Sequence, residues 1–142
     1  MLREKLVEIA LEWQDKFGVA PQITSAISEY DAAMLVGMSE DAYSKYMQDK
    51  TAVNKGSDFE FKGIRYQVKA NRPSGKPGSF VTKVPKASNY DWDTLIWILY
   101  DKNYVIKEAW SWNVEDYKKA FDSKNRLSPD DYRKGKSLYQ KE

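Results

Sequence analysis

The stretch DFEFKGIRYQVKA, residues 58–70, decides how the centre of this chain folds. Two short runs of alternating apolar and polar residues flank the dipeptide Lys62-Gly63, a pattern that is typical of a tight β-hairpin. If the turn is centred on this dipeptide, Phe61 pairs with Ile64 and the whole register of the hairpin follows from that pair.

Three polar residues of this hairpin are expected to lie together. Asp58 falls opposite Gln67 in the predicted register, with the two Cα atoms within about 5.5 Å. Lys69 follows one pleat later on the same face, because residues two apart in a strand share a face. Asp58 can ligate a divalent cation, Gln67 can add a neutral oxygen, and Lys69 can hold a water molecule or stabilise phosphate charge. The alternative interpretation is an ordinary polar strand face exposed to solvent.

The composition is that of a globular protein with a single domain. The chain has 142 residues, of which 42% are apolar and 31% charged, and its 5 Trp, 10 Tyr and 5 Phe can fill a core. It has no cysteine and no histidine, which excludes disulfides, thiolate or histidine zinc sites and Ser-His-Asp triads. Any catalysis must therefore use carboxylates, lysine, hydroxyls or a hard cation such as Mg²⁺ or Mn²⁺.

The N-terminal segment and the apolar runs predict a protein that does not contact a membrane. The segment MLREKLVEIALEW carries charges throughout its apolar part, which argues against a signal peptide. The longest apolar run, residues 95–100, is far shorter than a membrane span. Together with the lack of cysteine, these features favour a cytoplasmic protein.

The order of helical and strand patterns predicts an α+β or mixed α/β domain with a central mixed sheet of about four strands flanked by helices. Residues 1–50 form a helical N-terminal part, residues 56–112 the sheet core, and residues 113–142 two C-terminal helices. The predicted helices cover residues 2–17, 25–37, 39–47 and 113–121, and a last one begins at Ser128-Pro129. The predicted strands cover residues 58–61, 64–70, 94–100 and 104–112. The first helix is indicated by apolar residues at spacings of three and four, namely Leu6, Ile9, Trp13 and Phe17.

The segment GSDFEFKGIRYQVKA resembles the core of the PD-(D/E)xK nuclease superfamily, which has the restriction-endonuclease-like fold. In that superfamily a metal-binding Asp precedes a strand that carries (D/E)xK, and some members have QxK instead. Asp58, Gln67 and Lys69 match the QxK form. The segment AISEYDAAMLVG supplies Glu29 where many members carry a helical glutamate, and the order of elements over residues 22–112 also agrees.

The resemblance implies an endonuclease that hydrolyses DNA phosphodiester bonds with Mg²⁺ or Mn²⁺, in the manner of a restriction enzyme or a Holliday-junction resolvase. The implied metal ligands are Asp58, Gln67, the backbone carbonyl of Val68, and Glu29. Lys69 would position or activate the attacking water.

Two departures from the family pattern leave alternatives open. Ser57 stands where the motif has its proline, and the neutral Gln67 removes one negative charge from the site. Glu60 shares a strand face with Asp58 and is the reserve candidate if Glu29 does not reach the metal. The alternatives are a catalytically inactive nucleic-acid-binding module of the same fold, or an interaction protein that binds an acidic partner.

Positive charge is concentrated in one part of the sequence. Between Phe61 and Tyr90 there are seven Lys and Arg residues and no Asp or Glu. Such a stretch suggests an anionic partner, although a solvated basic loop has the same composition. The residues expected to contact DNA phosphates are Arg65, Arg72, Lys76, Lys83 and Lys86. RNA is an alternative partner, and cutting both strands of a duplex would call for a homodimer.

Overall fold

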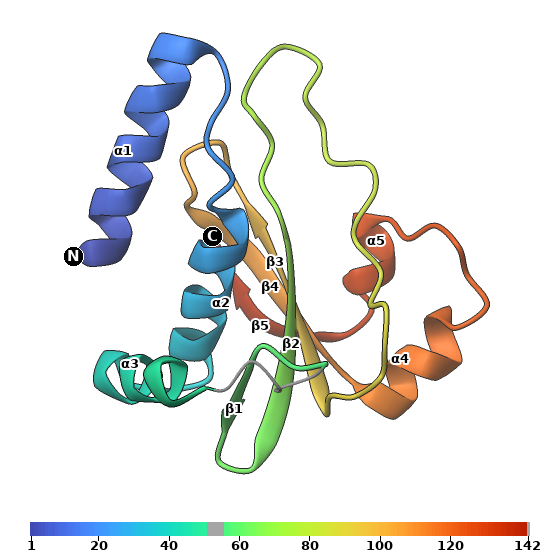
Figure 1. The fold of residues 1–142 in the computed structure, drawn as a ribbon. Coiled ribbons are helices and arrows are strands. Elements are labelled where there is room, and N and C mark those ends of the chain that lie inside the picture. Colours follow the sequence, from blue (N-terminus) through green and yellow to red (C-terminus); the bar gives the residue numbers. More distant parts are fainter. Residues whose placement is uncertain (51–55, 142) are drawn as a thin grey trace.

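The computed structural model describes residues 1–50 and 56–141, and it shows one mixed five-stranded sheet with helices on both faces (Figure 1). The helices are α1 (Leu2–Phe17), α2 (Thr24–Leu35), α3 (Glu40–Asp49), α4 (Val114–Phe121) and α5 (Pro129–Tyr132). The strands are β1 (Phe59–Phe61), β2 (Ile64–Asn71), β3 (Thr94–Tyr100), β4 (Ile106–Asn113) and β5 (Lys136–Gln140). The predicted fold class, a mixed sheet flanked by helices, is therefore confirmed.

The sheet has the strand order β1-β2-β3-β4-β5, in which β2 and β3 are parallel and every other neighbouring pair is antiparallel. The β1–β2 hairpin has the predicted register, with Phe61 opposite Ile64. Its turn residues Lys62 and Gly63 both have positive φ angles, 52° and 78°, as a two-residue type I′ hairpin requires. Because β1 has only three residues, the second half of β2 is left as an edge of the sheet.

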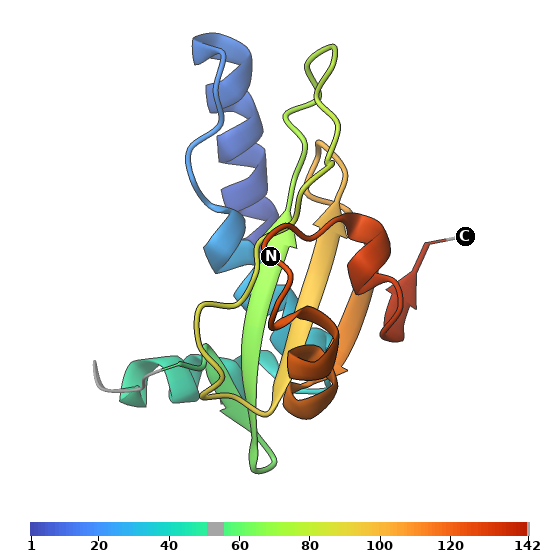
Figure 2. The same ribbon diagram turned by 90° about the vertical axis from the view of Figure 1, so that its right-hand side faces the viewer.

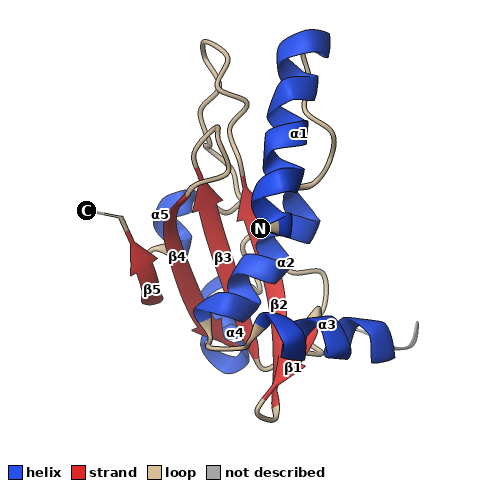
Figure 3. Ribbon diagram, turned by 90° about the vertical axis from the view of Figure 1, so that its left-hand side faces the viewer, coloured by secondary structure: helices blue, strands red, loops and turns tan. Residues whose placement is uncertain are grey.

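β3 is buried on both faces, and its alternating side chains build two separate cores. Ile96, Ile98 and Tyr100 belong to the core beneath α1 and α2. Leu95 and Trp97 belong to the core beneath α4 and α5. Figures 2 and 3 show these two layers, with α4 and α5 on one side of the sheet and the three N-terminal helices on the other. None of the helices in the described part of the chain is long and apolar enough to cross a membrane.

Helix α1 has the predicted bounds, but the apolar residues that predicted it do not enter the core. The buried side chains of α1 are those of Val7 and Ala10. The predicting residues are instead exposed, at 37% for Leu6, 58% for Ile9, 52% for Trp13 and 57% for Phe17. Polar contacts hold the inner face, because Arg3 bonds to Asp31 of α2 and Gln14 donates to the carbonyl of Ser74.

The C-terminal region differs from the prediction of two helices over residues 113–142. Helix α4 begins where expected, and the Asn113 side chain caps it by accepting from the Asp116 amide. Helix α5 is a single turn with a capping box between Ser128 and Asp131. The chain then forms β5, an unpredicted strand that pairs antiparallel with β4. Its sequence, KSLYQ, shows only a weak alternation of apolar and polar residues. Four of its five residues are exposed, so no buried face marks it as a strand.

Candidate functional site at the edge of the sheet

A cavity of about 280 Å³ opens beside the exposed half of β2, between α2 and the loop that precedes β3. Residues from α2, from the hairpin and from the loop line it, and these are Thr24, Ser25, Ser28, Glu29, Asp58, Gln67, Val68, Lys69, Ala70 and Pro85. The four side chains that the sequence singled out for catalysis therefore share one cavity.

Asp58 is fixed at this edge by two hydrogen bonds to β2. Its backbone amide donates to the Tyr66 carbonyl at 2.7 Å, and its Oδ2 accepts from the Val68 amide at 2.7 Å. Burial raises the pKa of Asp58, whereas the Val68 amide and the charges of Lys50 and Lys69 act in the opposite direction. In an extended strand the N–H and C=O of one residue point to the same side, so the Val68 carbonyl also faces the Asp58 edge.

Glu29 approaches the same cavity from α2, and its carboxylate is half-buried. Burial is the main cause that raises the pKa of Glu29 to about 7, and the negative charge of Asp58 raises it further. Lys50 opposes this shift. Two carboxylates that repel each other in a partly buried cavity form an environment that a bound cation would stabilise.

Gln67 and Lys69 complete the cavity from β2. They are alternate residues of one strand and project from the same face, next to the Asp58 carboxylate. The positive charge of Lys69 favours the ionised form of Asp58 and so lowers its pKa. The reserve candidate Glu60 is exposed and does not line this cavity.

Two further residues belong to this environment and were missed by the sequence analysis. Lys50, at the end of α3, donates from its Nζ to the Asp58 carbonyl oxygen at 2.8 Å. The pKa of Tyr43 is raised to about 12 by burial and by the charges of Glu29 and Asp58. Nothing in the local sequence pattern marks either residue, because each reaches the site only through the way α3 packs.

Three of the five predicted phosphate-binding residues have partners within the protein. Arg65 forms an exposed ion pair with Asp93, with Nη2 and Oδ1 3.1 Å apart. The Arg72 guanidinium lies 4.4 Å from the ring centre of Tyr104 and donates to the Lys102 carbonyl. The Lys86 ammonium donates to two carbonyl oxygens, those of Asp122 and Lys124, both at 3.0 Å.

The other two predicted residues, Lys76 and Lys83, are exposed. No ion pair joins either of them to another residue of the described chain. Of the five residues that were expected to contact phosphates, these two lysines are the ones that are exposed and lack an ion pair in the described chain.

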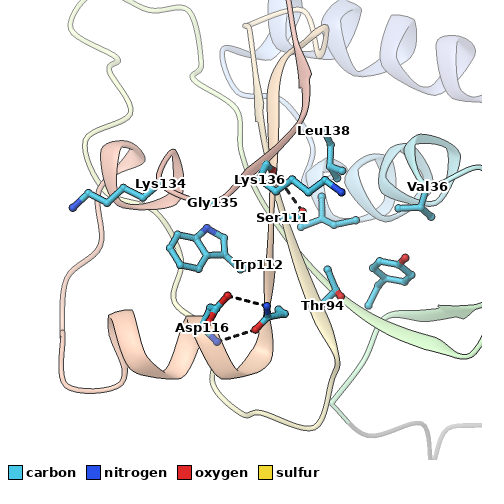
Figure 4. A pocket seen from close by; sticks show the side chains of 12 residues that line it. Val36, Thr94, Ser111, Trp112, Asp116, Lys134, Gly135, Lys136 and Leu138 are labelled. Carbon is cyan, nitrogen blue, oxygen red and sulfur yellow. Dashed lines mark hydrogen bonds between the residues drawn. The ribbon is translucent and has the colours of Figure 1, made fainter.

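A larger cavity, of about 530 Å³, lies on the sheet face beyond the end of α2 (Figure 4). Strands β3, β4 and β5 contribute most of its lining. Among the described residues that line it, Asp116 alone has a carboxylate, and that group accepts from the Asn113 side chain at 2.9 Å. This cavity is larger than the one beside β2, but it does not bring two free carboxylates together.

No protein-family model matches the chain, and no curated protein matches it either. Within residues 1–50 and 56–141, no group of three or more His, Cys, Asp or Glu is placed to hold a metal ion. The cavity beside β2 thus offers two carboxylates, from Glu29 and Asp58, together with the neutral oxygens of Gln67 and Val68.

Proposed function

We propose that the protein is a cytoplasmic nuclease of the PD-(D/E)xK superfamily, with a QxK site and the restriction-endonuclease-like fold. It hydrolyses phosphodiester bonds of DNA with the help of Mg²⁺ or Mn²⁺. The observation that carries this proposal is the shared cavity at the edge of β2, where Glu29 and Asp58 lie with Gln67 and Lys69.

The donor set of the cavity suits a hard cation. Asp58 and Glu29 would provide charged oxygens, and the Gln67 side chain and Val68 carbonyl would provide neutral ones. Such a cation acidifies a bound water molecule and neutralises charge that develops on the phosphate. Burial and, after it, the negative charge of Asp58 raise the pKa of Glu29, and this supports the assignment because a bound cation would offset both effects.

The remaining residues have roles that follow from their positions. The Val68 amide fixes the Asp58 carboxylate in one orientation. A carboxylate that is already oriented loses little conformational freedom when it binds a cation. The Lys69 ammonium lies beside that carboxylate and would orient the attacking water or stabilise the phosphate oxygens. Lys50 holds the segment that carries Asp58 through the backbone carbonyl.

A second candidate function is DNA binding without cleavage on the same scaffold. The neutral Gln67 favours this candidate, because it leaves two carboxylates where a D…ExK site has at least three acidic positions including the helical glutamate. Exposed Lys76 and Lys83 would then supply the affinity for phosphates. Binding of an acidic protein by these lysines is the remaining alternative.

Cleavage assays with two variants test the proposal. Supercoiled and single-stranded DNA are incubated with the protein and Mg²⁺, Mn²⁺ or EDTA. Asp58→Asn keeps an oxygen for the Val68 amide but removes the charge, and Lys69→Ala removes the ammonium. Each should lower cleavage by at least about 10³-fold, equivalent to about 4 kcal/mol.

Glu60→Gln is the matched control, since Glu60 lies on the same hairpin outside the cavity. It should cleave like the unmodified protein. Cleavage that does not need a divalent metal, or that survives in Asp58→Asn, would overturn the nuclease assignment. Metal-independent and salt-sensitive DNA binding without any cleavage would favour the second candidate.

A further inference from the structure

The N-terminal segment carries an unusual concentration of exposed apolar side chains. Of the twelve large hydrophobic residues that are exposed in the described part of the chain, seven lie within residues 1–19. Four of them, here called the α1 stripe, follow one another along the helix: Leu2, Leu6, Ile9 and Trp13. Contiguous apolar surface of this kind marks a site of interaction.

The spacing of the α1 stripe is that of a helix-pairing seam. Its members are separated by four, three and four residues, which is the a/d pattern of a two-stranded coiled coil. The inner face of α1 is a different face, which carries Val7 and Ala10 and is already packed on the protein. Figure 3 shows that the upper half of α1 extends beyond α2 without another helix beside it.

The charges beside the stripe distinguish between partner orientations. Lys5 and Glu12 are both exposed and flank the seam as g positions of the heptad. In a two-fold antiparallel pair, Leu6 faces Ile9 of the second copy, and each Lys5 approaches Glu12 of the second copy. In a parallel pair the residues facing Lys5 and Glu12 would be Ala10 and Phe17, so no opposite charges would meet. The seam is thus self-complementary only in the antiparallel orientation.

A groove between α1 and α2 fits the same arrangement. It has a volume of about 140 Å³ and is lined largely by apolar groups, among them Leu2, Leu6, Ala26 and Tyr30. The antiparallel register places Trp13 of the second copy opposite Leu2, next to this groove. Trp13 is 52% exposed and its ring lies against Phe17 at 4.8 Å between ring centres, so it forms a broad apolar projection.

We propose that the α1 stripe is a homodimerisation surface, on which two copies of the chain pair their α1 helices antiparallel about a two-fold axis. In the register that pairs Leu2 with Trp13, residues 2–13 of the two helices overlap, and this overlap spans about 18 Å. An interface of this length is at the small end of the range for specific complexes, so we expect reversible dimers with a micromolar dissociation constant.

Sedimentation velocity across micromolar to submillimolar concentrations tests this surface. The protein should shift from monomer to dimer, and Ile9→Asp should remain monomeric throughout. Ile9 is 58% exposed, so this variant should keep the fold, and its near-UV circular dichroism should be unchanged. Lys5→Glu should weaken the dimer roughly tenfold, because the new carboxylate would face Glu12 of the second copy at both symmetry-related contacts.

The charge-swapped variant Lys5→Glu/Glu12→Lys is the decisive control, and it should restore the dissociation constant of the unmodified protein. A protein that stays monomeric at all concentrations would overturn the proposal. So would dimers that Ile9→Asp leaves intact, or binding of monomers to lipid vesicles that Ile9→Asp abolishes. The readout does not involve cleavage, and the Asp58→Asn variant should form the same dimer, so this inference stands or fails separately from the proposed nuclease activity.

Discussion

Glu29 and Asp31 lie two residues apart on α2, yet their carboxylates have opposite surroundings. Asp31 is buried and accepts from the Nε of Arg3 at 2.7 Å and from the hydroxyl of Tyr100 at 2.6 Å. Glu29 is half-buried, and the nearby charge that raises its pKa is a second carboxylate, that of Asp58.

The contrast separates a carboxylate that maintains the fold from one that is available for chemistry. Asp31 has its countercharge within the chain, so its burial is compensated and no ligand is needed. Glu29 and Asp58 share a cavity in which burial and the repulsion between their charges raise the pKa of Glu29, and the charge of Lys50 opposes this rise only in part. Groups that destabilise the folded protein persist where a ligand uses them.

The basic residues divide in the same way. Arg72 and Lys86 are engaged by carbonyl oxygens of other segments, so they hold the loop between β2 and β3 in place. Lys76 and Lys83 are exposed, and neither has an ion pair in the described chain. The contacts that a basic side chain makes within the protein, and not its charge alone, therefore decide whether it is available to a partner.

The largest expected effect on stability follows from breaking the paired carboxylate. Asp31→Asn leaves the Arg3 guanidinium, whose side chain is only 18% exposed, without its countercharge. We expect the free energy of unfolding to fall by about 3 kcal/mol. Urea denaturation measures this loss, and isothermal titration with Mn²⁺ at a temperature where the variant is folded should show unchanged affinity. A stable Asp31→Asn protein that has lost metal binding would reverse the assignment of the two carboxylates.

The second prediction compares free with engaged lysines. Lys76→Gln/Lys83→Gln should reduce the slope of log K against log salt by about 2, and lower DNA affinity roughly 50-fold at moderate salt. Lys86→Gln is the matched control, and because its ammonium is held by two carbonyls it should change the salt slope by less. Fluorescence anisotropy with a labelled duplex measures both quantities. Equal slopes for all three proteins would show that DNA does not contact these lysines.

The third prediction adds negative charge to the cavity. Gln67→Glu would supply a third carboxylate beside Glu29 and Asp58, so Mn²⁺ should bind about tenfold more tightly, equivalent to about 1.4 kcal/mol. Without metal, the same variant should be less stable than the unmodified protein because the repulsion increases. Calorimetric titration and metal-free denaturation measure the two effects. Tighter binding without any loss of metal-free stability would contradict the explanation by charge.

Much of the fold was predictable because it depends on local pattern. The Lys62-Gly63 turn and the alternation around it fix the hairpin register without reference to the rest of the chain. The sequence could not predict that the α1 stripe faces away from the core, since periodicity defines an apolar face of a helix but not what covers that face. β5 was missed because its pairing with β4 is long-range and its exposed sequence carries little alternation.

At the candidate site too, local sequence pattern predicts contacts within the hairpin but not contacts between distant elements. Asp58, Gln67 and Lys69 were brought together by hairpin geometry, and the structure lines one cavity with all three. Glu29 was indicated only by resemblance to a family, because the packing of α2 against β2 is not encoded in either segment alone. The contact of Lys50 with the Asp58 carbonyl depends on how α3 lies in the folded chain, so no spacing rule could find it.

The smallest expected effect concerns the pH dependence of the metal-free protein. The pKa of Glu29 is about 7 in the folded protein and close to its ordinary value of 4.5 when unfolded, so the folded state binds more protons between these values. The free energy of unfolding should therefore fall as the pH rises from about 4.5 to about 7. Glu29→Gln should remove this contribution and stabilise the metal-free protein at pH above 7, by roughly 1 kcal/mol or less given the partial exposure of the group.

Urea denaturation in EDTA at a series of pH values measures the difference between the unmodified protein and Glu29→Gln. The two curves should converge at low pH, where Glu29 is protonated in both states, and separate as the pH rises. Saturating Mn²⁺ should reverse their order at high pH, because the ionised Glu29 then gains a countercharge that the glutamine variant cannot use. Parallel curves in EDTA would mean that Glu29 ionises like an exposed acid, and the contrast with Asp31 would lose its electrostatic basis.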